Sequence, residues 1–379
     1  MPILVSAGEA SGEMYGAQLI EALRKRNPSL TFFGAGGERM RAAGCEILVD
    51  AKDLAVVGIT EVVSHLPKIL DLYKNLIRAA DDRHPNLAVV IDSPAFNWRV
   101  ARQMRKRGIP VVYYVCPQFW AWRKGRVKLL RKYVDKALVI FPFEEKFYRD
   151  RGVNATFVGH PLADLPAPSV TREEYAAQHG LDLGKLWIAI MPGSRRKEVR
   201  MNLPTILDAV DRLGSDYEFL LPVARTLEPA FLKGLIETRP PESSAKRGIH
   251  LVPEALPALY HSRVGIVASG TATVEAAIMG TPFVMVYRVS PLTYALGKPR
   301  VKVAHYAMVN LIAEEEIVPE LVQAKFTPEN IVSELSKVLP DGLARTRMMQ
   351  GLGAVKAKLQ SAGAHPSEKA AAIIIEMLR

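Results

Sequence analysis

The sequence is poor in cysteine and has no long apolar run. Its 379 residues include two cysteines, Cys45 and Cys116, which are too few for a disulfide framework or a Cys-x-x-Cys zinc site. No apolar stretch approaches the ~20 residues of a membrane-spanning helix, and the first residues enter a strand-like run without a basic leader. We therefore expect a protein on the cytosolic side of the membrane.

Common nucleotide-binding motifs are missing as well. The segment GAGGER has glycines at positions 34, 36 and 37, but Arg39 stands where a dinucleotide fingerprint needs its last glycine. The sequence has no Walker A motif and no Asp-x-Asp pair that would bring a metal to a nucleotide. These absences argue against an NAD enzyme and a P-loop kinase, and we expect neither a cofactor nor a metal site.

Positive charge is concentrated in one segment. The formal net charge is +11, and the segment 99–136 alone carries twelve Lys or Arg residues against one acidic residue, Asp135. The rest of the chain is balanced, so an anionic partner is expected to bind at this one place. Trp120 and Trp122 precede the densest part, in CPQFWAWRKGR. A core segment, a membrane-binding surface and a nucleic-acid surface all fit this composition.

Short apolar runs alternate with helical stretches along nearly the whole chain. The runs are continuously apolar, as expected for parallel strands that are covered on both faces. Pro161, Pro166 and Pro168 mark a linker, after which the pattern starts again. The sequence therefore predicts two Rossmann-like α/β domains with parallel sheets and a cleft between them, residues 1–162 and 163–344, with helices from about 345 to 379 packing back onto the first. Strands are predicted at 3–7, 31–35, 87–93, 111–115, 137–141 and 156–159, and in WIAIMPGS, YEFLLPV, IHLVPEA, VGIVASG and PFVMVYR.

The loop MPGSRRKEV in the second half has the composition of a phosphate site. It follows a predicted strand, and Gly193 and Ser194 would let the backbone approach an anion. Arg195 offers a planar fork that matches phosphate geometry. An ordinary strand-turn-helix connection with solvated arginines remains an alternative.

The loop ASGTATVE offers a second anion site. Ser269, Gly270 and Thr271 precede a predicted helix, whose free N–H groups and dipole favour negative charge. Glu275 lies one turn further on, where a carboxylate could bind the hydroxyls of a ribose. The alternative is that Thr271 is only an N-cap and Glu275 only a solvated acid of the first turn.

Two amides complete the second-half candidates, and two carboxylates stand out in the first half. Asn310 and Gln323 could hydrogen-bond a nucleotide or sugar, although single amides are usually structural. The three loops together predict a nucleoside diphosphate held without a metal. Glu9 and Asp92 each follow a predicted strand, so both would lie at the carboxyl edge of one sheet as acid or base candidates. Either carboxylate could instead be a helix cap, and His160 beside the linker is either a cleft residue or structural.

Eleven short strings now converge on one family. They occur in order between residues 8 and 323, and together the chain resembles the lipid-A-disaccharide synthases. The resemblance implies an inverting, metal-independent glycosyltransferase of the two-domain GT-B class. Such an enzyme joins UDP-2,3-diacylglucosamine to 2,3-diacylglucosamine 1-phosphate (lipid X) through a β-1,6 bond and releases UDP. The strings are GEASGE, GAGG, GIxEV, IDSPxFNWR, WAWRKxRV, FPFE, VGHPL, PGSRxxEV, ASGTATVE, VYR and PELVQ.

The resemblance also implies roles for the candidate residues. Asp92 would take the proton from the acceptor 6-hydroxyl, and Glu9 would be a second essential carboxylate. Arg195 and Asn310 would hold the phosphates, Thr271 and its helix would stabilise departing UDP, and Glu275 would bind the ribose. The full set expected to bind the UDP-sugar is Gly193, Ser194, Arg195, Ser269, Gly270, Thr271, Glu275, Asn310 and Gln323.

The sequence departs from the usual family pattern at a few positions. Glu13 and Ala95 stand where the family commonly has Asp, and Cys116 stands where it has Ser. Met308 and Val309 replace a Leu-Pro pair before Asn310. None of these changes removes a proposed catalytic group, but they bear on the geometry around Asp92 and Asn310.

The implied substrates give the basic segment a purpose. Both lie in the inner leaflet of the cytoplasmic membrane, so we expect a peripheral protein whose basic residues meet anionic headgroups. The amphipathic run Val62–Ile77 would add apolar surface for acyl chains or is a core-facing helix. The residues expected at the acceptor or the membrane are Trp120, Trp122, Arg123, Lys124, Arg126 and Lys128.

Two rival hypotheses remain at this point. One keeps the fold and changes the reaction, to the transferase of lipid II synthesis or a UDP-N-acetylglucosamine 2-epimerase, against which IDSPxFNWR and WAWR argue. The other is a nucleic-acid-binding protein that uses the basic segment, but no known binding module is recognisable, and we expect no nucleic acid. The oligomeric state is open, with a homodimer among the alternatives.

Overall fold

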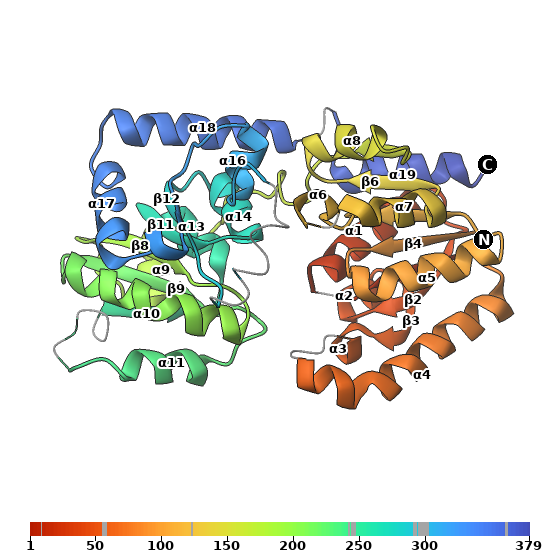
Figure 1. Cartoon of the computed structure of the whole chain (residues 1–379), viewed down its shortest axis with the longest axis horizontal. Coiled ribbons are helices and arrows are strands. Elements are labelled where there is room, and N and C mark those ends of the chain that lie inside the picture. Colours follow the sequence, from red (N-terminus) through yellow and green to blue (C-terminus); the bar gives the residue numbers. More distant parts are fainter. Residues whose placement is uncertain are drawn as a thin grey trace. The chain divides into compact units, whose positions relative to one another are not determined.

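The protein consists of two compact units, each with its own parallel sheet. The computed structural model describes residues 1–8, 10–54, 59–122, 124–241, 243, 248–290, 294, 303–360 and 363–379. One unit comprises Met1–Asp164 with Leu359–Arg379, and the other comprises Leu165–Lys358. In each unit, helices cover the sheet (Figure 1). The predicted fold class, α/β with two parallel sheets, is confirmed.

The first unit has a sheet of seven strands in the order β3-β2-β1-β4-β5-β6-β7. All neighbours pair in parallel, and the order reverses between β1 and β4, which makes that pair the switch point of a doubly wound fold. The strands are β1 (Pro2–Ala7), β2 (Thr31–Gly36), β3 (Cys45–Asp50), β4 (Leu87–Ile91), β5 (Val111–Tyr114), β6 (Lys136–Val139) and β7 (Ala155–Phe157). The helices are α1 (Ala10–Arg26), α2 (Glu38–Ala42), α3 (Ala51–Leu54), α4 (Ile59–Arg83), α5 (Pro94–Lys106), α6 (Phe119–Trp122), α7 (Val127–Tyr133), α8 (Pro142–Arg149) and α19 (Pro366–Met377).

The second unit repeats this plan with six parallel strands in the order β10-β9-β8-β11-β12-β13. Its switch point lies between β8 and β11. The strands are β8 (Leu186–Met191), β9 (Tyr217–Pro222), β10 (Ile249–Val252), β11 (Val264–Ala268), β12 (Phe283–Tyr287) and β13 (Glu320–Val322). The helices are α9 (Arg172–His179), α10 (Arg196–Leu213), α11 (Pro229–Glu237), α13 (Ala255–His261), α14 (Thr271–Met279), α16 (Met308–Ala313), α17 (Pro328–Val338) and α18 (Leu343–Leu359).

Strand register brings the candidate loops together at each switch point. Ala7 of β1 pairs with Ile91 of β4, so the chain leaves the sheet at Gly8 and at Asp92 from neighbouring positions. The central strands are continuous apolar runs, and all five residues of β4 and of β11 are buried. Because both faces are covered, the polar chemistry of each unit is confined to the loops at the strand ends.

The C-terminal segment is divided between the units. Lys356 and Lys358 on α18 donate hydrogen bonds to the carbonyls of Ile278 and Ile312, so α18 belongs largely to the second unit. Helix α19 packs on α1, where Glu368 pairs with Arg26 at 3.2 Å. The segment that returns to the first unit therefore begins at Leu359, later than the expected position near residue 345.

Two strands, β3 and β13, are not predicted by the pattern of apolar runs, and both lie at sheet edges. β3 reads CEILVD, of which Cys45 and Val49 are buried, while β13 has three residues. An edge strand is covered less completely than a central one, so its sequence lacks the continuous apolar run that identifies the others.

Candidate active site

Asp92 lies in a strained turn directly after β4. Asp92 and Ser93 both adopt left-handed backbone conformations, with φ of 47° and 44°. Non-glycine residues rarely adopt this conformation, and two in succession persist only where the surroundings enforce them. The Asp92 side chain is half-buried. Its expected companion, Glu9, lies outside the described residues.

A buried amide enforces the Asp92 turn. Asn97 on α5 is fully buried, and the two N–H groups of its Nδ2 are shared among the carbonyls of Ser6, Ile91 and Asp92, at 3.1, 2.8 and 2.9 Å. Its Oδ1 accepts from the Ser6 hydroxyl at 2.6 Å. One side chain thus ties the end of β1 to the end of β4 and fixes the backbone on which the Asp92 carboxylate is carried.

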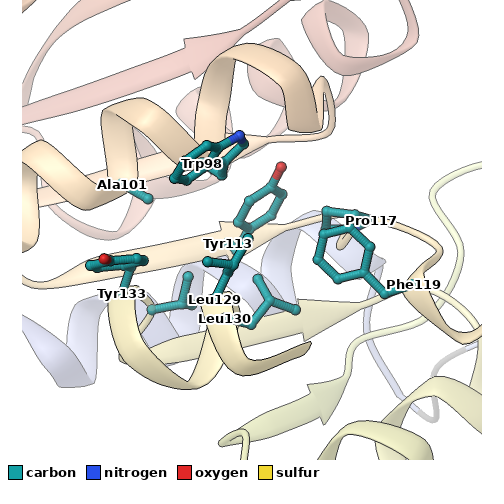
Figure 2. A pocket seen from close by; sticks show the side chains of 9 residues that line it. Trp98, Ala101, Tyr113, Pro117, Phe119, Leu129, Leu130 and Tyr133 are labelled. Atoms are coloured by element: carbon teal, nitrogen blue, oxygen red, sulfur yellow. The ribbon is translucent and has the colours of Figure 1, made fainter. Parts of the chain in front are cut away.

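Tyr113 on β5 also hydrogen-bonds the backbone of the Asp92 turn. Its hydroxyl donates to the Asp92 carbonyl at 2.8 Å. Figure 2 shows the Tyr113 ring between Trp98 on α5 and Leu129 and Leu130 on α7, beside a small cavity lined by apolar side chains. The surroundings hold the ring in place, so the hydroxyl stays aimed at the turn, and burial raises the pKa of the Tyr113 phenol well above its usual value.

The loop after β5 is held by a buried carboxylate. Trp120 is 7% exposed, and its Nε1 donates to Glu144 Oε1 at 2.9 Å. The other oxygen of Glu144 accepts from the Phe141 N–H at 3.2 Å, as in a helix-capping box. Burial raises the pKa of Glu144 to about 7, against the lowering effect of these hydrogen bonds. Trp120 is therefore the ring that faces the protein, while the Trp122 side chain and Arg123 lie outside the described residues.

Beyond this loop the basic segment is exposed and largely unpaired. Arg105 pairs with Asp135 at 2.8 Å and Arg107 with Asp81 at 2.5 Å. No other member of the segment has a carboxylate within 4.0 Å among the residues that the structure describes. The exposed residues without such a partner are Arg99, Arg102, Lys106, Lys124, Arg126, Lys128, Arg131 and Lys132.

The amphipathic run in α4 faces the core over its described part. The side chains of residues 54–66 lie outside the described set, Val63 and Leu66 among them. Leu76 is fully buried, and Ile69 and Tyr73 pack against the core of the first unit. Leu70 is 46% exposed. The described residues therefore favour the core-facing interpretation of this run.

In the second unit, the loop after β8 presents the predicted phosphate donors. Gly193 has φ of 124°, a conformation that favours glycine. Ser194 and Arg195 are exposed, and α10 begins at Arg196 with no side-chain cap. Asn202, buried in the second turn of α10, donates to the Pro192 carbonyl at 2.8 Å and anchors the loop. The exposed residues Ser194 and Arg195 therefore bring backbone and arginine donors to the N-terminus of a long helix, which suits an anion.

The loop after β11 lies at the other side of this switch point. Ser269 Oγ donates to the Tyr306 carbonyl at 2.8 Å, and Gly270, with φ of 144°, is the N-cap of α14. Thr271 is therefore the first helical residue and not the cap, and its side chain is exposed. Glu275 accepts no hydrogen bond within the described residues, and burial raises the pKa of its carboxyl. A half-buried carboxylate without a donor fits a group that receives ribose hydroxyls.

The Asn310 amide has no hydrogen-bonding capacity left for a phosphate. It is fully buried, and its Nδ2 donates to the Val318 carbonyl and to Glu320 Oε1, both at 2.9 Å. Its Oδ1 accepts from the N–H groups of Ile317 and Val318, both at 3.0 Å. These bonds use both N–H groups and both lone pairs of the amide. The expected phosphate contact is therefore replaced by a structural role, and Asn310 leaves the candidate set.

Gln323 and His160 also make contacts within the protein. Gln323 Nε2 donates to the Val289 carbonyl at 3.3 Å, and its φ is 52°. His160 is 1% exposed, its Nδ1 accepts from the Leu162 N–H at 3.2 Å, and burial lowers its pKa to about 3. A neutral, internally bonded imidazole is structural.

Sequence reasoning missed the side chains that support the candidates. Asn97, Tyr113 and Glu144 lie in the strings FNWR, VVYYV and FPFE. A polar residue inside an otherwise apolar helix face, as at Asn97, is the one local signal that points to a buried role. The partners of Tyr113 and Glu144 lie 21 and 24 residues away in sequence, so no local pattern reveals them.

The described residues show neither a metal-binding cluster nor a membrane-spanning helix. Within the described ranges, no group of three or more His, Cys, Asp or Glu side chains is arranged to hold a metal ion. No helix in the part of the chain that the structure describes is long and apolar enough to cross a membrane.

Comparisons with known proteins agree with the sequence resemblance. The profile of the family described as Lipid-A-disaccharide synthetase matches residues 3–374. The chain is 51% identical to the Lipid-A-disaccharide synthase of Koribacter versatilis (strain Ellin345), covering 100% of this chain and 98% of that protein. It is 49% identical to the protein of the same name from Acidobacterium capsulatum, over 100% and 96% of the two chains. The glycosyltransferase of kitacinnamycin has a similar fold, with a TM-score of 0.65 at 15% identity over 100% of this chain and 99% of that one.

Proposed function

The chain belongs to the lipid-A-disaccharide synthetase family, and from this premise we propose how its residues divide the work of the reaction. The enzyme is a glycosyltransferase that condenses UDP-2,3-diacylglucosamine with 2,3-diacylglucosamine 1-phosphate, or lipid X. The anomeric carbon bonds to the acceptor 6-hydroxyl oxygen, that hydroxyl loses its proton, and UDP leaves with the electrons of the broken bond. The protein must therefore supply a base for the hydroxyl and positive groups for the departing UDP.

Asp92 is the base in this proposal, and the strained turn that carries it is the observation on which the assignment rests. The turn lies at the switch point of the first sheet, where doubly wound folds bind ligands. Asn97 and Tyr113 hold its backbone, so the carboxylate is pre-positioned before substrate binds. Proton removal by a positioned carboxylate contributes ~10² to 10⁴-fold. Glu9, at the end of the paired strand, is proposed as the second carboxylate.

The switch-point loops of the second unit bind UDP in this proposal. Arg195 and the backbone of Gly193 and Ser194 receive the phosphates, together with the N-terminus of α14 at Thr271. Such donors act mainly as negative charge builds on the leaving UDP, and each contributes ~3 to 4 kcal/mol by analogy with oxyanion-hole donors. Glu275 takes the ribose hydroxyls. Ser269, Gly270 and Gln323 complete the wall of the site.

The acceptor and membrane surface is assigned to the basic segment. Apart from Arg105 and Arg107, its exposed cations have no carboxylate partner among the described residues, so they remain available to the phosphate of lipid X and to anionic headgroups. The residues are Lys124, Arg126 and Lys128, together with Trp122, whose side chain is outside the description, and Arg123, which lies outside the described residues. Trp120 is buried and contributes indirectly, because its hydrogen bond to Glu144 holds the loop in place. We propose peripheral attachment at the inner face of the cytoplasmic membrane.

Product analysis tests the assigned reaction. Purified protein is incubated with both acylated sugars, and the products are identified by mass spectrometry while released UDP is quantified. The expected result is a disaccharide 1-phosphate and UDP in equal amounts, and neither product when one sugar is omitted. Release of UDP without lipid X, or an epimerised sugar nucleotide, would contradict the assignment.

A further inference from the structure

The Glu198 carboxylate contacts two of the hydrogen-bond donors that the proposed nucleotide site would use to bind a phosphate. Its Oε1 is 3.0 Å from Arg195 Nη1, and its Oε2 accepts from the Ser194 N–H at 3.3 Å. Arg195 and Ser194 are exposed, so these donors are also within reach of a ligand. A carboxylate of the protein therefore occupies an anion position at the N-terminus of α10.

The loop is closely fitted to this carboxylate. A Cβ added at Gly193 would lie 2.8 Å from Glu198 Cβ and 2.9 Å from Glu198 Oε2. Glu198 is the third residue of α10, where a glutamate commonly bonds the N–H of the N-cap residue. Here it reaches one residue further, to Ser194, and also pairs with the side chain of the N-cap residue Arg195. An ordinary capping interaction does not account for both contacts.

We propose that Glu198 is a displaceable internal anion, which holds Arg195 and the Ser194 N–H until a nucleotide diphosphate takes them over. This inference rests on the proposed role of the loop in UDP binding. The pair is exposed, with the Arg195 side chain 67% accessible, and exposed ion pairs are weak. A diphosphate binds the arginine guanidinium more strongly than this carboxylate does, so it displaces Glu198 from Arg195. The carboxylate then remains nearby and repels the phosphates, which lowers the affinity for UDP and speeds its release.

Calorimetric titration of the full-length protein with UDP tests the inference through a double-mutant cycle. The proteins are wild type, Glu198→Gln, Arg195→Met and the double variant. Glutamine retains a carbonyl for the Ser194 N–H but loses the charge. We expect Glu198→Gln to bind UDP about 3- to 10-fold more tightly, the scale of one charge interaction at about 4 Å that is screened by bulk water, because the site is exposed. In the Arg195→Met background the gain should fall below about twofold, because the contested donor is gone.

The matched control is Glu228→Gln, which removes the carboxylate that pairs with the neighbouring Arg196 at 3.1 Å. Its UDP affinity should equal that of wild type. Unchanged or weaker UDP binding by Glu198→Gln, with thermal unfolding like that of wild type, would overturn the inference and leave Glu198 as a loop support. If Glu198→Gln is unstable, Glu198→Asp, which keeps the charge, should not bind UDP more tightly than wild type. Wild-type UDP binding that does not depend on Arg195 would instead contradict the proposed nucleotide site.

Discussion

At the scale of single residues, the Asp92 turn depends on side chains that never need to touch a substrate. Asn97 makes four hydrogen bonds to the ends of β1 and β4, and Tyr113 adds one to the Asp92 carbonyl. The position of Asp92 could be predicted, because a residue that directly follows a buried parallel strand lies at the carboxyl edge of the sheet. Asn97 and Tyr113 could not be assigned, because their partners are fixed only by tertiary packing.

Removing the Tyr113 hydroxyl tests this support with little change in packing. Tyr113→Phe loses one hydrogen bond to the Asp92 carbonyl, so the unfolding free energy should fall by about 1 kcal/mol. Turnover should fall several-fold at saturating substrate, with little change in the KM for the UDP-sugar. Tyr148→Phe is the control, because it also removes a buried hydroxyl that donates to a carbonyl, that of Pro117. Equal turnover in both variants would show that Tyr113 does not position the base.

Glu144 predicts a pH-dependent stability. The pKa of its carboxyl is raised in the folded protein from 4.5 to about 7, so between these values the folded state binds more protons than the unfolded state. The contribution of Glu144 to stability is therefore most favourable below pH 4.5 and is lost as the pH rises through 7. Glu144→Gln cannot ionise, so its stability relative to wild type should rise by roughly 3 kcal/mol between about pH 5 and pH 8. Denaturant unfolding at several pH values measures the difference, and a constant difference would contradict the prediction.

At the scale of elements, the two glycine-containing loops proposed to bind anions have the strand-turn-helix structure that their sequences predict, while the Asn310 amide is buried and bonded within the protein. Gly193, Gly270 and the starts of α10 and α14 lie at strand ends because glycine, strand and helix signals are local. Its sequence context suggests that Asn310 is a polar loop residue. In the structure it is buried in α16, and its side chain hydrogen-bonds the backbone of the segment before β13. Its partners come from residues 317–320, and the backbone geometry that brings them together is not visible in the sequence.

The basic segment around α7 predicts charge-dependent membrane binding. Lys124, Arg126 and Lys128 are exposed and have no carboxylate partner within the described residues. Changing all three to Glu should abolish most co-sedimentation with vesicles containing anionic lipid, since each cation near the surface contributes about 1 kcal/mol. The control carries the same charge change at the exposed residues Lys233, Lys325 and Arg347 of the second unit. Equal loss of binding in both triple variants would indicate a non-specific charge effect.

At the scale of the whole molecule, the two doubly wound units and the linker region were predictable because central parallel strands form continuous apolar runs. All of the predicted strands exist, and the edge strands β3 and β13 were missed because their sequences are partly polar or very short. The assignment of α18 could not be made from its sequence, because what holds it is a pair of lysines that bond carbonyls of the second unit. The family resemblance read from the strings is confirmed along residues 3–374.

The proposal that UDP binds to the second unit predicts which backbone amides exchange more slowly when UDP is bound. Hydrogen exchange with and without UDP should slow in residues 192–198 and 268–275, and should change little around residues 91–97. The reason is that the proposed phosphate donors all belong to the second unit, whereas the Asp92 turn is already held by Asn97. Protection centred on the Asp92 turn would contradict the assignment of UDP to the second unit.

The most direct test of the central claim is the turnover of Asp92→Asn. Asparagine keeps the size of the side chain and cannot take a proton, while the backbone bonds from Asn97 and Tyr113 remain. With both acylated sugars at saturation, we predict disaccharide formation ~10² to 10⁴-fold slower than in wild type. Turnover close to that of wild type would show that Asp92 is not the base.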